Sequence, residues 1–273
     1  KYPTQLNLTR QEINRGELTL KQFGIPNNAK IVCVACRDSL YLKKVQPSIN
    51  YSYHSFRNSN IDNFIPAIKA LIKKKFYVIR MGNVAAKRVN LKNNKFIDYP
   101  FHPLKSDFMD FFFAYKCYFW VGSNSGLDEL GRLFRKPVAS MNMAPIVCMN
   151  MYRKKQIVSL KTHINSKNQK LNVSKIFDYG VASAHKTNIF NEKKIKLKEH
   201  SSEQIKDIVL EMLMLIKNSW KIKNKKDLKL QRQFKKIYIK KIKESNLPYL
   251  CGGLGLKSNY SINFLKKNRW FLK

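Results

Sequence analysis

Residues 121–130 read Val121-Gly122-Ser123-Asn124-Ser125-Gly126-Leu127-Asp128-Glu129-Leu130. The apolar run before them, Tyr118-Phe119-Trp120-Val121, is typical of a buried strand, and apolar residues follow at helical spacing at Leu127, Leu130, Leu133 and Phe134. The pattern predicts a strand, a turn of small polar residues and a helix. The free N–H groups and dipole of such a helix start can hold a phosphate or diphosphate, and small residues let the backbone approach it. The alternative is an ordinary strand-to-helix connection with a Ser or Asn cap.

The rest of the chain repeats this alternation of strand-like and helix-like segments. Strands are predicted at 31–36, 76–80, 96–98, 117–121 and 137–140. Helices are predicted at 12–23, at 61–75 after a capping box of Ser59 and Asp62, at 106–115, from the loop to about 135, and at 202–217. Such alternation predicts an α/β fold, with a Rossmann-like parallel sheet and helices on both faces. Residues 39–58 and 141–155 show no regular pattern and are predicted to be irregular.

The composition divides the chain into three segments. Residues 1–30 are a polar approach to the domain that contains one helix, residues 31–220 form the Rossmann-like domain, and residues 221–273 form a basic C-terminal helical extension. The chain begins abruptly without a Met, and we expect a preceding N-terminal portion to be absent.

Three polar groups follow predicted strands. They are Arg37 after the first strand, Gly82-Asn83 after the second, and the Ser123–Gly126 loop after the fourth. Because ligands of open parallel sheets bind outside the carboxyl ends of the strands, we expect these groups to converge on one site.

The charge of the chain is extreme, with 53 Lys and Arg against 17 Asp and Glu and a formal net charge of +36. Such a field attracts nucleic acids, anionic lipids and phosphorylated small molecules alike. A high content of Lys, Asn and Ile also fits a chain encoded by an A+T-rich genome, in which Lys spreads over every surface. A nucleic-acid-binding protein needs clustered Lys and Arg among exposed aromatics, and only residues 217–243 approach that pattern. Residues 221–243 are predicted either to contact an anionic membrane or to be a solvated helix that packs its apolar stripe on the domain.

No metal site is predicted. The five Cys residues (33, 36, 117, 148 and 251) form no regular framework, and Cys33 and Cys36 have no second pair to complete a tetrahedral zinc site. The five His residues are isolated and are predicted to be at the surface or locally hydrogen-bonded. The Cys usage favours a reduced, cytoplasmic location. The longest apolar run, 108–122, is broken by Asp110 and Lys116, so it is not predicted to span a membrane.

Several motifs resemble those of a family of bacterial glycosyltransferases. They are Arg57-Asn58-Ser59-Asn60-Ile61-Asp62-Asn63-Phe64 with Tyr77-Val78-Ile79-Arg80-Met81-Gly82, Cys36-Arg37-Asp38-Ser39-x-Tyr41-Leu42, Ser106-Asp107-Phe108-Met109-Asp110, Gly122-Ser123-Asn124-Ser125-Gly126-Leu127 and Ser261-Ile262-Asn263-Phe264-Leu265-x-x-Asn268. The resemblance covers roughly residues 31–145 and the last twenty or so. The family is similar to GT-B glycosyltransferases, whose carboxyl-terminal Rossmann-like half holds the nucleotide-sugar donor, and more distantly to O-fucosyltransferase-like and heptosyltransferase-like enzymes.

The resemblance implies a donor site. Arg37 takes the place of an Arg that binds the donor diphosphate, where a guanidinium stabilises the charge that forms on the leaving group. The alternative for Arg37 is a salt bridge to Asp38 or to a neighbouring helix. The other residues expected to contact the nucleotide sugar are Arg80, Gly82, Asn83, Ser123, Asn124, Ser125, Gly126 and Glu129. The expected partners are therefore a nucleotide-sugar donor, a glycan or lipid-linked acceptor of the cell envelope and, at the periphery, an anionic membrane on the inner face.

Two departures from the family limit this interpretation. Ala35 stands where the family often has a His, and a GT-B enzyme needs an N-terminal acceptor domain for which this chain is too short. No general base is therefore assigned. No Asp-x-Asp pair is present to hold a metal on a diphosphate, so a metal-independent mechanism without a cofactor is expected. The alternatives are a basic nucleic-acid-binding protein and a non-catalytic nucleotide-sugar-binding module.

Overall fold

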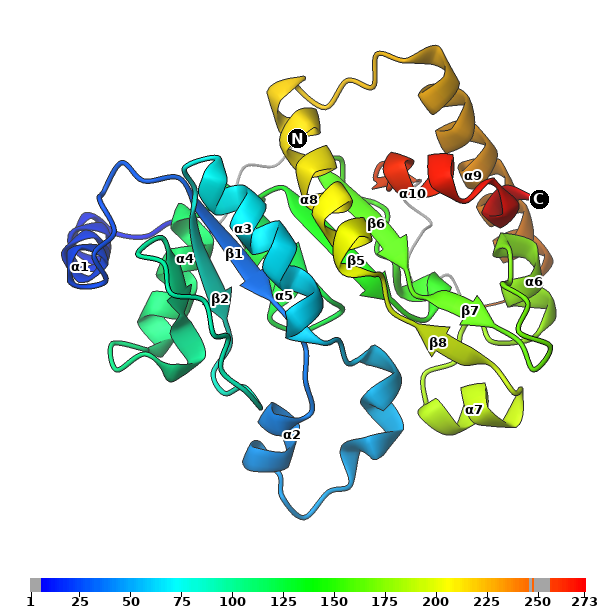
Figure 1. The fold of residues 1–273 in the computed structure, drawn as a ribbon, viewed down its shortest axis with the longest axis horizontal. Coiled ribbons are helices and arrows are strands. Elements are labelled where there is room, and N and C mark those ends of the chain that lie inside the picture. The colour runs from blue at the N-terminus through cyan, green and yellow to red at the C-terminus, as the bar shows by residue number, and fades with distance from the viewer. Residues whose placement is uncertain (1–5, 246, 248–255) are drawn as a thin grey trace.

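Seven parallel strands form the central sheet of the computed structural model, which describes residues 6–245, 247 and 256–273 (Figure 1). They lie in the order β3-β2-β1-β4-β5-β6-β9, and each neighbouring pair is parallel. Their bounds are β1 Ile31–Ala35, β2 Tyr77–Met81, β3 Phe96–Asp98, β4 Phe119–Gly122, β5 Val138–Met143, β6 Gln156–Leu160 and β9 Asn259–Tyr260. The order reverses direction between β1 and β4, as in doubly wound folds. The predicted α/β fold with a Rossmann-like parallel sheet is confirmed.

Helices cover both faces of this sheet (Figure 1). One face carries α3 (Ile65–Lys73) and α8 (Ser202–Lys217), and the other carries α1 (Arg10–Gln22), α4 (Asp107–Lys116) and α5 (Asp128–Leu133). Because side chains alternate along a strand, Val32 of β1 enters the first core while its neighbour Cys33 enters the second. The second core includes a close approach of α1 to α4, since a Cβ on Gly16 would lie 2.1 Å from the Phe112 ring.

The chain between β1 and α3 differs from the prediction. Residues 39–58 are not irregular throughout, because they contain α2 (Leu40–Val45) and the 3-10 helix η1 (Tyr51–Arg57). The predicted capping box is wrong. Asn60 caps a 3-10 turn (η2, Ile61–Phe64), and α3 begins only at Ile65. The Ser59 side chain is buried and accepts a hydrogen bond from Asn142 instead.

The predicted loop at 141–155 is also partly wrong, because β5 continues to Met143 and the following residues enter the core. Met149 and Met151 are both at most 1% exposed. The pairing of β5 with β6 shifts register between Ser140 and Met143, and Asn142 in this irregularity has a φ of 54°. The side chain of Asn142 is fully buried and bonds to polar partners, so a polar residue does not mark a surface loop here.

A small substructure follows β6. Its strands β7 (Thr162–Ile164) and β8 (Lys196–Lys198) pair antiparallel, and α6 (Val173–Asp178) and α7 (Thr187–Glu192) lie between them in sequence. Helix α7 holds η1 in place, because Phe56 donates its backbone N–H to the Thr187 hydroxyl at 3.2 Å and its ring packs on Phe190. This contact fixes the segment that carries Arg57.

The chain beyond residue 220 contributes to the same sheet. It contains α9 (Lys225–Glu244), β9, α10 (Ile262–Lys267) and the 3-10 helix η5 (Arg269–Leu272), while Cys251 lies outside the described residues. Strand β9 pairs with β6, and the apolar stripe of α9 enters the core through Leu230, Phe234 and Tyr238. The basic helix therefore packs its apolar side on the domain, which is one of the two predicted arrangements.

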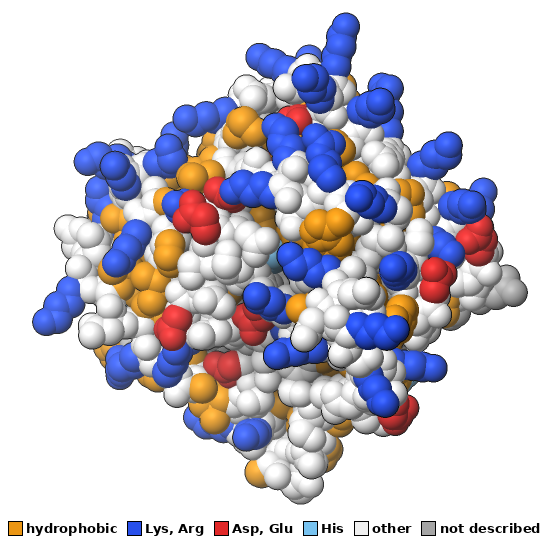
Figure 2. All heavy atoms as spheres, turned by 45° about the vertical axis from the view of Figure 1, so that its right-hand side comes forward, with side chains coloured by type: hydrophobic (Ala, Val, Ile, Leu, Met, Phe, Trp, Pro, Cys, Tyr) orange, Lys and Arg blue, Asp and Glu red, His pale blue; other side chains and the backbone are white. Residues whose placement is uncertain are grey.

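The surface carries Lys and Arg over every part of the face shown in Figure 2, with few acidic side chains between them. The charge is spread on this face rather than gathered over one element. No helix within the described part of the chain combines the length and apolarity needed to cross a bilayer.

Candidate functional site

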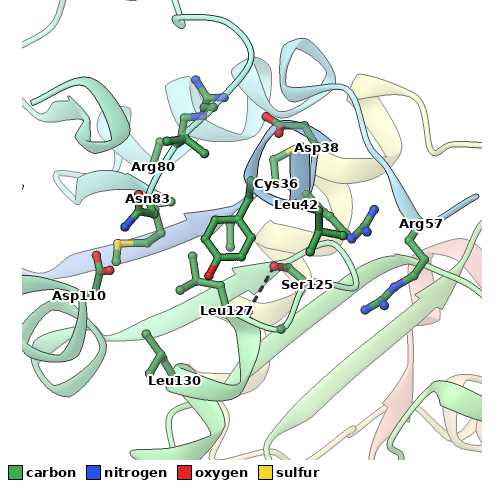
Figure 3. Close-up of a pocket in the computed structure, with 18 of the residues that line it drawn as sticks. Cys36, Asp38, Leu42, Arg57, Arg80, Asn83, Asp110, Ser125, Leu127 and Leu130 are labelled. Carbon is green, nitrogen blue, oxygen red and sulfur yellow. Dashed lines mark hydrogen bonds between the residues drawn. The ribbon is translucent and has the colours of Figure 1, made fainter. Parts of the chain in front are cut away.

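A cavity of about 760 Å³ opens at the carboxyl ends of β1, β2 and β4, where the strand order reverses (Figure 3). We call it the switch-point cavity. Its lining includes residues 35–38 from the end of β1 onward, 80–85 from the end of β2 onward, the 125–127 part of the loop after β4, and side chains of α2 and α4. The size is in the range of sites that enclose small organic ligands, and the position is where open α/β sheets bind them.

Six of the nine predicted site residues line this cavity: Arg37, Arg80, Gly82, Asn83, Ser125 and Gly126. Two others, Asn124 and Glu129, line an adjoining hollow of about 280 Å³ that shares His54, Arg57 and Gly126 with the cavity. Ser123 reaches neither, because it is fully buried and its hydroxyl accepts the backbone N–H of Arg37 at 2.8 Å.

Arg37 is half-buried and forms no ion pair with any carboxylate of the described residues. Its guanidinium donates to the backbone oxygen of His54 at 3.3 Å and to the side-chain oxygen of Asn58. The alternative of a salt bridge to Asp38 is not formed, since that carboxylate accepts the backbone N–H groups of Leu40 and Ala86. Burial, with a smaller effect of nearby Arg57, lowers the pKa of Arg37 to about 10.

Arg57 is a second cation of the site that sequence reasoning did not assign. It lies on the edge of the switch-point cavity in Figure 3 and donates to the backbone oxygen of Asn124 at 2.8 Å. It too has no carboxylate partner within the described chain, and burial lowers its pKa. Burial and the two arginines also lower the pKa of His54. Two neighbouring guanidinium groups with no carboxylate within ion-pair distance favour an anion bound between them, and Asp38 and Asp128 act on them only at longer range.

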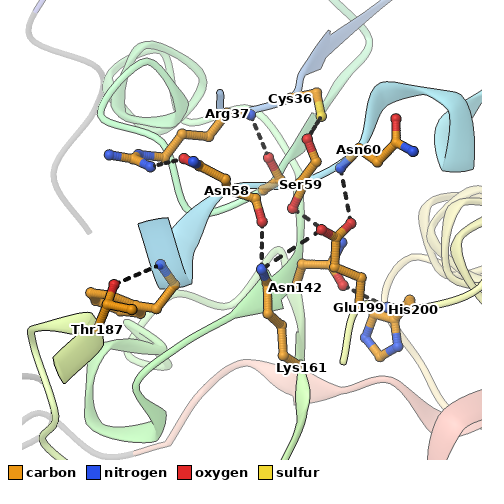
Figure 4. Close-up of polar contacts among 12 residues, drawn as sticks. Cys36, Arg37, Asn58, Ser59, Asn60, Asn142, Lys161, Thr187, Glu199 and His200 are labelled. Carbon is orange, nitrogen blue, oxygen red and sulfur yellow. Dashed lines mark hydrogen bonds and ion pairs between the residues drawn. The ribbon is translucent and has the colours of Figure 1, made fainter. Parts of the chain in front are cut away.

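A polar network holds the 58–60 segment beside Arg37 (Figure 4). The Lys161 ammonium donates to the backbone oxygen of Asn58 and lies 3.9 Å from the Glu199 carboxylate, which accepts the backbone N–H of Asn60 at 2.9 Å. Asn142 accepts the backbone N–H of His200 at 2.8 Å. His200 is 1% exposed, so the prediction of a surface or locally bonded His is wrong there, and burial lowers its pKa to about 4.

The loop after β4 is already bonded within itself. The buried Asp128 carboxylate accepts the backbone N–H of Ser125 at 3.0 Å and the indole N–H of Trp120 at 3.0 Å. Its pKa is raised, chiefly by burial. Asn124 takes a φ of 65° and donates its side-chain amide to Ala144. A carboxylate therefore occupies part of the helix start that was expected to hold a phosphate, and the positive charge of the site comes from Arg37 and Arg57.

The remaining predicted charges are compensated inside the protein. Arg80 is 2% exposed, pairs with Asp98 at 3.1 Å and donates to the Lys87 backbone. Glu129 pairs with Arg132. The guanidinium of Arg80 is thus used within the protein although it lines the cavity, while the Glu129 side chain remains 57% exposed beside its partner.

The wall after β2 needs a glycine. Gly82 has a φ of 149°, and a Cβ on it would lie 3.3 Å from Pro100. Its neighbour Asn83 is exposed, lines the cavity and accepts the Lys105 ammonium on its backbone oxygen. The side chain of Asn83 is therefore available to a ligand at this wall.

Asp110 is an acidic group of the cavity that the sequence analysis did not assign. It lies in the first turn of α4, on the side of the cavity away from Arg57 (Figure 3). Its Oδ1 is buried without a hydrogen-bond partner, and burial raises its pKa to about 6. A carboxyl group with these properties can accept hydrogen bonds or a proton from a bound ligand near neutral pH. The sequence signal was an acidic residue within the otherwise apolar run at 108–113.

No three His, Cys, Asp or Glu side chains of the described residues converge into a set that could hold a metal ion. No model of a known protein family matches the chain, and no match was found among curated proteins or solved structures. The resemblance to bacterial glycosyltransferases stays a prediction, and the inference of function depends on the residues of the cavity.

Proposed function

We propose that the protein is a glycosyltransferase of the GT-B type that uses a nucleotide sugar, and that the switch-point cavity is its donor site. The observation that carries the proposal is the pair Arg37 and Arg57, two half-buried guanidinium groups with no carboxylate partner among the described residues. Such a pair fits a diphosphate, because each guanidinium can bind phosphate oxygens with two parallel hydrogen bonds.

The chemistry of sugar transfer needs positive charge at this place. When the bond between the sugar and the diphosphate breaks, the leaving nucleoside diphosphate gains negative charge. Groups fixed in advance around that charge stabilise the transition state without reorganising. Arg37 and Arg57 can supply this stabilisation themselves, so the proposed mechanism needs no metal ion.

The rest of the cavity suits an uncharged part of the donor. Tyr41, Leu42, Leu127 and Leu130 supply apolar surface for the face of a base or sugar ring. Asn83 and Asp110 supply hydrogen-bonding groups at the side away from Arg57. The acceptor that we propose is a glycan or lipid-linked molecule of the cell envelope, which places the reaction in the cytoplasm or at the inner membrane face.

The proposal is tested by calorimetry with GDP, UDP, ADP and CMP at moderate salt. We expect selective binding of one nucleotide and an affinity about 30- to 100-fold lower in Arg37→Ala, since two charge-assisted hydrogen bonds are lost. Arg10→Ala is the matched control, because it removes one exposed positive charge from the remote helix α1 and should leave binding unchanged.

Two results separate the alternatives. Equal weak binding of all four nucleotides, unchanged in Arg37→Ala and abolished by salt, contradicts the proposal and leaves a general polyanion effect. If one nucleotide binds selectively, release of the nucleoside diphosphate from the matching nucleotide sugar distinguishes a transferase from a non-catalytic binding module.

A further inference from the structure

The segment between β1 and η1 projects from the carboxyl edge of the sheet beside the cavity (Figure 1). No residue of α2 is buried, and every residue from 43 to 50 is exposed. Three large apolar side chains of this segment are exposed at intervals of four residues: Tyr41 by 48%, Val45 by 55% and Ile49 by 46%. Packing within the described chain does not account for them, and a concentration of exposed apolar groups marks an interaction surface.

The charge of the same segment selects the kind of partner. Residues 39–61 contain no Asp or Glu, while Lys43 and Lys44 lie between the exposed apolar residues. Neither lysine forms an ion pair in the part of the chain that the structure describes. Apolar side chains flanked by lysines are complementary to a surface that is anionic outside and apolar beneath, which is an anionic bilayer.

A second hollow beside the cavity adds places for anionic headgroups. It has a volume of about 420 Å³, and its lining includes Lys43, Lys44 and Lys105. It shares Asn83 and Ala85 with the switch-point cavity. A headgroup phosphate held by these lysines would therefore lie next to the mouth of the cavity.

The base of the projection is firmly held. Ser59 donates its backbone N–H to the Arg37 backbone oxygen at 2.9 Å, and Asp38 accepts the backbone N–H groups of Leu40 and Ala86. The projection thus leaves the sheet and returns to it at one place, so a partner bound at its tip has a fixed position relative to the cavity.

We propose that residues 40–49 dock the protein on an anionic bilayer, with Val45 and Ile49 entering the headgroup boundary and the mouth of the cavity beside the membrane surface. A nucleic acid would also meet the lysines, but of the three exposed apolar side chains only Tyr41 could stack on a base, while the aliphatic Val45 and Ile49 could not. The proposal does not depend on the proposed glycosyltransferase function, because vesicle binding and nucleotide binding are measured separately.

The test is cosedimentation with vesicles of phosphatidylcholine alone and of phosphatidylcholine mixed with phosphatidylglycerol, at moderate salt. We expect binding to the mixed vesicles and an affinity about tenfold lower for the double variant Val45→Ser, Ile49→Ser. The control is Leu18→Ser, Met214→Ser, which removes two aliphatic side chains that are 61% and 48% exposed on α1 and α8. The control should bind as the wild type does.

A second pair of variants tests the charge. Lys43→Gln, Lys44→Gln should weaken binding about tenfold, and Lys73→Gln, Lys74→Gln, two exposed lysines at the end of α3, should weaken it less than twofold. Equal losses in the two lysine pairs would show that binding follows the net charge of the whole protein, and equal losses in the two aliphatic pairs would show that exposed aliphatic groups contribute wherever they lie; either result would overturn the proposal. So would failure of the wild type to bind mixed vesicles. A third contrary result is a loss of single-stranded oligonucleotide affinity in Val45→Ser, Ile49→Ser with vesicle binding unchanged.

Discussion

At the β9 edge of the sheet a buried carboxylate is surrounded by hydrogen-bond donors, whereas the two half-buried cations at the β1–β4 switch point face a cavity and have no carboxylate within ion-pair distance among the described residues. Glu211 is 2% exposed and accepts three hydrogen bonds, from the Ser261 hydroxyl and the backbone N–H groups of Ile262 and Asn263. Arg37 and Arg57 bond only to neutral oxygens. The two regions belong to one sheet, but their charged groups lie in different environments.

This difference distinguishes a structural polar group from a candidate ligand group. Burying a charge is costly, so a charged side chain with a structural role normally has hydrogen-bond or ion-pair partners within the protein. Glu211 has three such partners and joins α8 to α10, although burial still raises its pKa to about 7. The two arginines face a cavity and repel each other. The free energy that their burial and repulsion cost is not offset by contacts within the protein, but an anion bound between them can offset it.

The largest loss of stability that we expect from a single substitution is at the β9 edge. Glu211→Ala leaves the N–H groups of Ile262 and Asn263 and the Ser261 hydroxyl without an acceptor. We expect the free energy of unfolding to fall by about 3 kcal/mol in urea denaturation. Glu203→Ala on the same helix, whose exposed carboxylate pairs with Lys206, should change it by less than about 0.5 kcal/mol. A loss below about 1 kcal/mol for Glu211→Ala would mean that the network is not structural.

At the switch point we expect a substitution to weaken ligand binding and to leave the stability of the fold unchanged. Arg57→Ala removes a cation that repels Arg37, so the free energy of unfolding should stay the same or rise slightly. Affinity for the nucleotide that binds should fall about tenfold, as measured by calorimetry. Arg88→Ala is the control, because it removes an exposed arginine that packs on the Phe101 ring. If Arg57→Ala destabilises the fold by more than about 2 kcal/mol and leaves binding intact, Arg57 is structural and the comparison fails.

Much of the fold could be predicted because its signals are local. Runs such as Ile31–Ala35 and Phe119–Gly122 are apolar on both faces, as buried parallel strands must be. The extension of β5 and the helix α2 were missed. Asn142 is polar yet buried because distant residues supply its partners, and α2 carries no buried apolar stripe from which its pattern could be recognised.

The site was less predictable, because its residues come together through tertiary packing. Arg37 was assigned by resemblance and its position after β1 was predictable from the strand pattern. Arg57 lies twenty residues later and reaches the cavity because α7 holds η1 while Lys161 and Glu199 hold the 58–60 segment. Ser123 looked like a ligand contact, but its hydroxyl is used by the backbone of Arg37. Small polar residues at a strand end do not reveal which of them point inward.

The smallest expected effect concerns Asp110, at the side of the cavity away from Arg57. Burial raises its pKa to about 6, with smaller influences from Tyr99, Asp107 and Lys105. The folded protein therefore binds this proton more tightly than the unfolded chain does, and stability falls as pH rises from about 4 to about 6. Asp110→Asn has no carboxyl group to ionise, so its stability does not fall over this pH range. Its free energy of unfolding should exceed that of the wild type by about 1 kcal/mol above pH 7, because solvent screens the group, and the gain should vanish below about pH 4.

The pH profile of this gain separates a cavity carboxyl from an ordinary surface one. Glu192→Gln removes an exposed carboxylate from α7, which does not line the cavity, and should show no such gain. A gain for Asp110→Asn that is the same at pH 4 and pH 8 would reflect packing rather than titration. If it instead follows the titration and nucleotide affinity also falls, the cavity holds an uncompensated carboxyl opposite its uncompensated arginines. Both ends of the cavity would then carry charge that the fold does not need, which is the arrangement expected of a site for a ligand with one anionic end and one end rich in hydrogen-bond donors.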